Sequence, residues 1–262
     1  MGLKQVIKTE LYKNTHRKSS LILLIPMILA VLISFGYAKG FIKLNLTVGA
    51  GGKYSCMDFV FIIWNVLSGL GIMGILLILF AAFQFSGEIE HGQIKMELLR
   101  IGKRHTVVAG KYVAVMIVAA VAIAGTIFAC MVSYYLFVSN SPLGAGTFAS
   151  TTDGLSTWEI IASMMLQAVI YFVLTAICFL IGIKTGPFAT FILTMVIMYA
   201  VNYLAGADNV IARLMPSYWS NQLMMKGDVP WMQTALSVVI LLLFSAVQIC
   251  FMSYSFSKKD IK

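Results

Sequence analysis

The chain has 262 residues, of which 60% are hydrophobic and only 11% are charged, and its formal net charge is +9. The apolar residues form long uncharged blocks, which excludes a water-soluble globular domain and indicates an integral membrane protein. Because the basic residues flank these blocks in short clusters, anionic lipid head groups and membrane topology account for the positive charge, and no nucleic-acid partner is expected.

Six apolar blocks are long enough to cross a bilayer, which takes about 20 helical residues. Hydrocarbon offers no partner to unpaired backbone groups, so each block is expected to be a helix. The blocks cover residues 21–37, 59–86, 112–140, 160–183, 188–207 and 231–257, and none contains Asp, Glu, Lys, Arg or His. The first block is interpreted as a span and not a signal peptide, because no small-residue cleavage pattern follows it. The sequence therefore predicts an all-α membrane protein with one transmembrane domain over residues 1–262.

Lysine and arginine are distributed unevenly between alternate polar segments. The two termini, the loop at 87–111 and the short turn at 184–187 hold 14 of the 19 basic residues, and the opposite side holds 5. Translocation of cationic loops is disfavoured, so both termini and the 87–111 loop are predicted to be cytoplasmic. Gly186 and Pro187 in the short turn predict a tight hairpin between the fourth and fifth spans.

Several catalytic and binding patterns are missing from the sequence. A proton- or sodium-coupled carrier usually has ionisable residues inside its spans, and none lies inside a block here. No His or Asp lies in a span to activate Ser68, Ser133 or Ser163, so these serines are interpreted as helix-packing residues. No phosphate-binding loop is present, and the four cysteines, which contain no CxxC pair, indicate neither a metal site nor a disulfide framework. We expect no catalytic residues, no bound metal and no cofactor on this chain, and ATP hydrolysis for any uphill transport must come from a partner.

The loop after the second block mixes charged and apolar residues. Ile94, Leu98 and Ile101 follow one another at helical spacing and form one stripe of a short helix. Two interpretations remain open at this point. The segment is either an interfacial helix with snorkelling cations or a docking helix that a partner grips.

This loop resembles the signature of permeases of the type-2 ABC transporter family, in which an acidic residue and a glycine leave the second span and a leucine pair, an arginine and a lysine follow. The matching residues are Glu88, Glu90, Gly92, Leu98, Leu99, Arg104 and Lys111. Gln93 and Gly102 depart from the family pattern, which usually has Thr and Pro there. The segment Glu10-Leu11-Tyr12-Lys13 resembles the family's amphipathic elbow helix, with Leu3, Val6, Ile7 and Leu11 on one face that Glu10 interrupts. The ending 256–261 resembles the family's common C-terminus.

The resemblance implies a multi-pass permease in the bacterial cytoplasmic membrane, paired with a second identical or homologous permease and with two copies of an ATPase subunit that binds ATP and magnesium. The 87–111 loop would form a cytoplasmic coupling helix. Its candidate coupling residues also include Lys95 and Arg100, and Arg100 and Arg104 pair either with ATPase carboxylates or with lipid phosphates. Glu88 and Glu90 either accept hydrogen bonds from the ATPase or cap the docking helix.

The segment 208–229 places apolar bulk outside the fifth span, whereas the loop at 140–159 is rich in small polar residues and is expected to be a flexible connection. In the resembled family, the segment that corresponds to 208–229 holds short helices that dip into the outer leaflet. Met215, Pro216, Tyr218 and Trp219 are therefore candidate outer-gate residues, although Trp219 and Trp231 are equally explained as interfacial aromatics.

The uncharged spans favour an amphipathic or hydrophobic cargo, and the leading hypothesis is export of, or immunity to, an antimicrobial peptide. Multidrug or sodium extrusion by the same family is an alternative. A membrane scaffold or accessory subunit that moves nothing is another.

Overall fold

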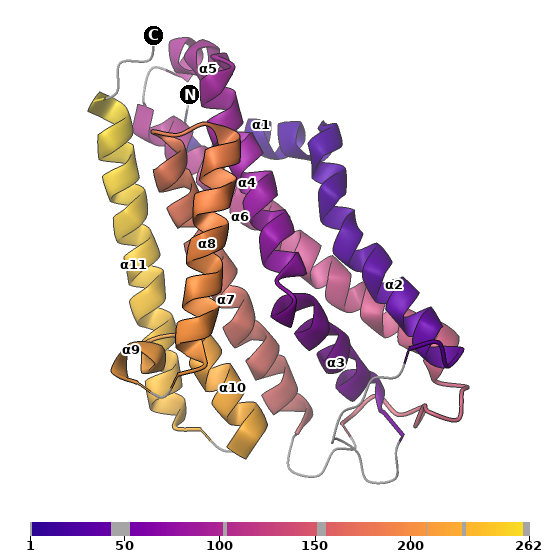
Figure 1. The fold of residues 1–262 in the computed structure, drawn as a ribbon. Helices are drawn as coiled ribbons and strands as arrows, with labels where there is room; N and C mark the ends of the chain where they lie inside the picture. The colour runs from indigo at the N-terminus through magenta and orange to yellow at the C-terminus, as the bar shows by residue number, and fades with distance from the viewer. Residues whose placement is uncertain are drawn as a thin grey trace.

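The computed structural model describes residues 2–42, 53–101, 104–150, 156–207, 209–226 and 229–258. These residues form helices, and their only extended pairing is an isolated bridge between Tyr54 and Gly144. Six helical segments are long and apolar enough to cross a membrane, which confirms the predicted all-α class and number of spans (Figure 1). The segments are Lys18–Ala38, Ile72–Glu90, Arg104–Val138, Thr157–Gly182, Pro187–Ala205 and Trp231–Phe256.

The N-terminal region contains a surface helix and the first span. Helix α1 (Leu3–His16) leads into a 3₁₀ helix, η1 (Lys18–Leu24), and then into α2 (Ile25–Ala38). Pro26 lies in the first turn of α2, where its missing N–H costs no hydrogen bond. Ser34 of α2 and Ser133 share a hydrogen bond of 2.8 Å, which confirms the packing role predicted for Ser133.

The second apolar block is two helices, and the prediction of a single helix over 59–86 was wrong. Helix α3 (Cys56–Gly69) ends before Leu70, and α4 (Ile72–Glu90) begins after Gly71. Gly71 adopts a left-handed backbone with φ of 72°, which side chains other than glycine rarely tolerate. The block is longer than one bilayer crossing requires, so the break lets α3 and α4 pack along different directions (Figure 1).

The remaining spans agree with the predicted blocks to within a few residues, except that α6 (Arg104–Ser133) begins earlier and continues as a π-helical turn, η2 (Tyr134–Val138). Helices α7 (Thr157–Gly182) and α8 (Pro187–Ala205) form the predicted hairpin, and α11 (Trp231–Lys258) is the last span. Phe85 of α4 and Phe179 of α7 stack with ring centroids 4.3 Å apart in the common core.

Helix α5 (Gln93–Ile101) and helix α1 lie at the same end of the helical bundle as the C-terminal end of α11 (Figure 1). We call this the basic end, because it holds the segments in which the basic residues are concentrated. The short helices α9 (Val210–Arg213) and α10 (Pro216–Lys226) lie at the opposite end. The segments that the charge distribution assigns to one side therefore lie at one end of the bundle.

The connection after α6 is not the free linker that the sequence suggested, at least as far as Ser150. The backbone N–H of Tyr54 donates to the carbonyl of Leu143, and that of Ala145 donates back to Tyr54. The Ser150 hydroxyl also donates to the Asp58 carboxylate at 2.5 Å. Small polar residues here form specific hydrogen bonds to the start of α3, which composition alone does not reveal.

The segment after the fifth span contains two short helices, as the resemblance implied. Tyr218 and Trp219 are buried against Leu166 and Leu223, and the Trp219 indole donates to the carbonyl of Arg213 at 2.8 Å. Trp219 is therefore a packing residue, and the interfacial interpretation does not apply to it. Trp231, in contrast, is exposed.

The break at Gly71 gives a testable prediction. An alanine Cβ there would lie 3.1 Å from the Tyr199 hydroxyl and 3.2 Å from the Met198 Cε, in addition to the unfavourable φ. We expect Gly71→Ala to lower the free energy of unfolding by about 1–2 kcal/mol, measured by denaturation in detergent micelles. Gly69→Ala is the control, because that position has open space and no positive φ. Equal stabilities for the two variants would contradict this account of the break.

Candidate functional site

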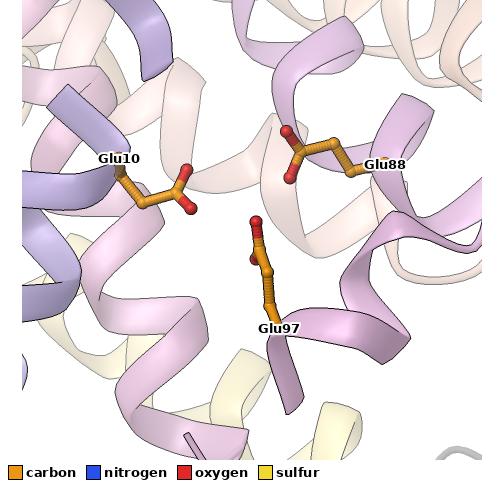
Figure 2. Close-up of side chains that lie close together, drawn as sticks. All are labelled: Glu10, Glu88 and Glu97. Carbon is orange, nitrogen blue, oxygen red and sulfur yellow. The ribbon is translucent and has the colours of Figure 1, made fainter. Parts of the chain in front are cut away.

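Six charged side chains from four segments of the chain converge at the basic end. We call them the charged cluster, and they are Glu10, Lys13, Arg17, Glu88, Glu97 and Lys111. Figure 2 shows the carboxylates of Glu10, Glu88 and Glu97 directed toward a common centre from α1, α4 and α5. The three negative and three positive formal charges balance.

Lys111 is the centre of the cluster and is only 2% exposed. Its ammonium Nζ lies 3.0 Å from Glu10 Oε1 and 2.6 Å from Glu97 Oε2, and it also contacts Glu88 Oε2. A buried ammonium is tolerated only when it is paired and hydrogen-bonded. The ammonium donates hydrogen bonds to Glu10 and Glu88, and its contact with Glu97 is an ion pair.

Lys13 contacts the same three carboxylates from the more exposed side. Its Nζ lies 2.7 Å from Glu10 Oε1, 2.9 Å from Glu88 Oε1 and 2.8 Å from Glu97 Oε1. The two lysines therefore bridge every carboxylate to α1 and to α6. Removing either one would leave the remaining charges unbalanced.

Arg17 completes the cluster where α1 ends. Its Nη1 lies 2.6 Å from Glu88 Oε1 and donates to Gln84 Oε1 at 2.7 Å, while Nη2 donates to Gln93 Oε1 at 3.0 Å. Gln93 is a position where the sequence departs from the resembled family. Its amide here joins the start of α5 to the end of α1.

The cluster shifts the pKa values of its two carboxyls outside the spans in opposite directions. Burial raises the pKa of Glu10 above its ordinary value, against the attraction of Lys111 and Lys13. Burial also acts to raise the pKa of Glu97, but the same two ammonium groups outweigh it and hold that pKa below its usual range. On acidification Glu10 therefore takes up a proton before Glu97 does.

Two glycines, one in a turn and one at a helix crossing, allow the backbone to bring these side chains together. Gly92, with φ of 69°, turns the chain from α4 into α5 and so brings Glu97 back toward Glu88. Helix α1 crosses α6 at Gly110, where an added Cβ would lie 2.6 Å from Val6 Cγ1. This contact brings Glu10 within reach of Lys111.

The cluster has the composition of a structural or switching element. A lysine held by three carboxylates stays protonated and is a poor nucleophile. The carboxylate oxygens lie within 4.8 Å of one another, as in an acidic metal site. However, the Lys111 ammonium contacts all three, and a divalent cation would have to displace it.

The structure separates the candidate coupling residues into buried and exposed groups. Glu88 and Lys111 are buried in the cluster, so Glu88 neither caps α5 nor faces outward, whereas Glu90 is exposed. Lys95 and Leu98 are half-buried and Leu99 is exposed. Arg104 donates to the carbonyl of Phe256 at 3.3 Å, near the end of α11. The side chain of Arg100 lies outside the described residues.

The elbow helix differs from its predicted amphipathic pattern. Its buried residues are Val6, Glu10 and Asn14, while Leu3 and Tyr12 are exposed and Leu11 is half-buried. Glu10, which interrupts the predicted apolar face, is thus the group that attaches the helix. Arg17, Gln84 and Glu97 belong to the site although they were not among its predicted residues. Their only signal in the sequence is a charged or amide side chain beside or within an apolar block.

Breaking the cluster at its centre should be costly. We expect Lys111→Met to lower the free energy of unfolding by about 3–5 kcal/mol, because it leaves three carboxylates with two cations. Adding Glu88→Gln should recover part of that loss, which a double-mutant cycle in detergent would measure as coupling. The control is Lys95→Met on α5, which is half-buried. Additive effects of Lys111→Met and Glu88→Gln would contradict the arrangement.

Comparison with known proteins identifies the family but not an activity. No curated protein matches the sequence. The model of the family described as "Protein of unknown function (DUF2705)" matches residues 23–262, which include all six candidate spans except the first few residues of Lys18–Ala38. The chain is thus a multi-pass membrane protein that belongs to the DUF2705 family.

Proposed function

We propose that this chain is the permease subunit of an ATP-binding cassette exporter, and that α5 is the helix on which its ATPase docks. The assembly would contain a second permease, identical or homologous, and two ATPase subunits that bind ATP and magnesium. The basic end then faces the cytoplasm of a bacterial cell, with both termini on that side, as the distribution of lysine and arginine favours.

The observation that carries this proposal is the surface of α5. Met96 and Leu99 are 72% and 84% exposed on a helix that lies between two spans at the basic end. The opposite side of the same helix is fixed, because Ile94 is fully buried and Glu97 belongs to the charged cluster. The exposed apolar side chains can bind a partner protein, and the anchored side can pass a movement of that partner to the rest of the chain.

The charged cluster supports the same role. A force applied to α5 would be transmitted through Glu97 to Lys111 on α6 and Lys13 on α1, whose contacts are 2.6 and 2.8 Å. Glu88 joins α4 to the same lysines. The cluster would therefore couple the docking helix to the elbow helix and to two spans, and Glu88 and Lys111 would act as positioning residues inside the permease.

An amphipathic antimicrobial peptide is the cargo we favour. The described spans carry charged side chains only near their ends, which at the end opposite the basic end means Glu159 in the first turn of α7. A charged or ion-coupled cargo therefore has no partner deeper in the membrane. Multidrug or sodium extrusion would use the same docking surface.

The test is affinity purification of the tagged chain from its native membranes, with ATPase recovery measured by immunoblot or mass spectrometry. We expect wild type to retain an ATPase subunit. Glu90→Arg and Leu99→Glu should each reduce its recovery by about tenfold or more, because they change exposed groups at the docking surface. Leu214→Glu is the matched control, since Leu214 is an exposed leucine at the opposite end.

Absence of an ATPase from the wild-type sample would favour the scaffold alternative. Undiminished recovery with Leu99→Glu would show that α5 is not the docking helix. In that case Met96 and Leu99 would be membrane-facing residues of an interfacial helix.

A further inference from the structure

A polar cavity lies in the half of the helical bundle away from the basic end. Its volume is about 200 Å³, and its walls come from α3, α7, α8 and α10. Ser68 and Gly69 place it beside the break between α3 and α4. None of the side chains that line it is charged, which restricts what it can hold.

One wall of the cavity is a fixed hydrogen-bond network centred on Gln167. Its Oε1 accepts from the Trp64 indole at 2.7 Å and from the Ser68 hydroxyl at 3.1 Å. Its Nε2 donates to Asn65 Oδ1 and to Ser220 Oγ, each at 3.1 Å. Because all of these bonds cross between helices, the network holds the cavity open in a defined shape.

The other wall carries polar groups that have no partner. Ser217 is only 9% exposed, and its buried hydroxyl oxygen has no hydrogen bond. Asn202 of α8 and Asn221 of α10 are exposed and make no hydrogen bond to the described residues. A buried hydroxyl without a partner costs free energy, and the Asn202 amide, which lies within a span, is similarly disfavoured against lipid. A bound molecule would satisfy all three groups.

We infer that this cavity binds the uncharged, amide-bearing head of an amphipathic molecule. Amides and hydroxyls both donate and accept, so the lining complements a peptide group better than a charged or purely apolar one. The volume is below the roughly 300–1,000 Å³ of pockets that enclose a whole drug-sized ligand. The cavity therefore holds the polar head, and the apolar part of the molecule stays in the surrounding lipid.

This inference deepens the proposed function by naming the cargo's chemistry, and it rests on that function for its role in transport. Binding itself does not depend on an ATPase. An assay on the full chain alone can thus fail while ATPase recovery succeeds, or the reverse, and the two proposals are tested separately.

The experiment measures equilibrium binding of tritiated N-dodecanoyl-glycylglycinamide to the full chain in phospholipid nanodiscs. Lipid is present in large excess, so saturable binding reports preference for the amide head over a lipid head group. The matched probe is N-dodecanoyl-glycylglycine, which differs by ending in a carboxylate. We expect the amide to bind saturably and the carboxylate to bind about tenfold more weakly or worse, because no cation lines the cavity.

Asn202→Leu and Asn221→Leu should each weaken binding of the amide about five- to tenfold through one lost hydrogen bond. Asn140→Leu is the control, because Asn140 is exposed and does not line the cavity, and it should leave binding unchanged. Ser217→Ala removes a single oxygen atom and keeps the test decisive if a leucine variant unfolds. Non-saturable binding by wild type, equal binding of the two probes, or unchanged affinity in the folded cavity variants would each overturn the inference.

Discussion

The interaction on which this structure depends is the contact of one buried ammonium, that of Lys111, with three carboxylates. Its partners Glu10, Glu88 and Glu97 come from α1, α4 and α5, so the position of a surface helix, a span and a connecting helix is set by one group on α6. A cluster of this kind is stable only when complete, because each missing partner leaves a buried charge. That requirement makes the basic end rigid where a pure apolar interface would allow sliding.

Hydropathy was sufficient to predict most of the fold, because a bilayer imposes one solution on every long apolar block. The prediction failed where local backbone geometry decides. Gly71 interrupts the second block through its left-handed conformation, and an apolar stretch gives no sign of this. Ser150 and Asp58 likewise pair between segments 92 residues apart in sequence, which composition of the loop cannot show.

The charged cluster was only half predictable. Glu88 and Lys111 stand out from the resemblance, but their direct contact depends on how α4 and α6 pack. Glu10 was interpreted as an interruption of an apolar helix face, because a helical pattern scored on hydrophobicity alone treats a buried carboxylate as an error. Gln167 was overlooked for a related reason. Its neutral amide lies within an apolar block, and its role in the cavity depends on how α3, α7 and α10 pack together.

The two sites are joined by a single helix. Helix α4 carries Glu88 in its last turn at the basic end, and its first residues follow Gly71, two positions beyond the cavity-lining Gly69. Any displacement of α5 that the charged cluster passes to α4 would therefore reach the break between α3 and α4 next to the cavity. Because α3 and α4 meet at a glycine and not within a continuous helix, α4 can tilt there without bending hydrogen-bonded turns. In the proposed exporter, the break between α3 and α4 would in this way let a push at the basic end change the shape of the cavity in the other half of the bundle.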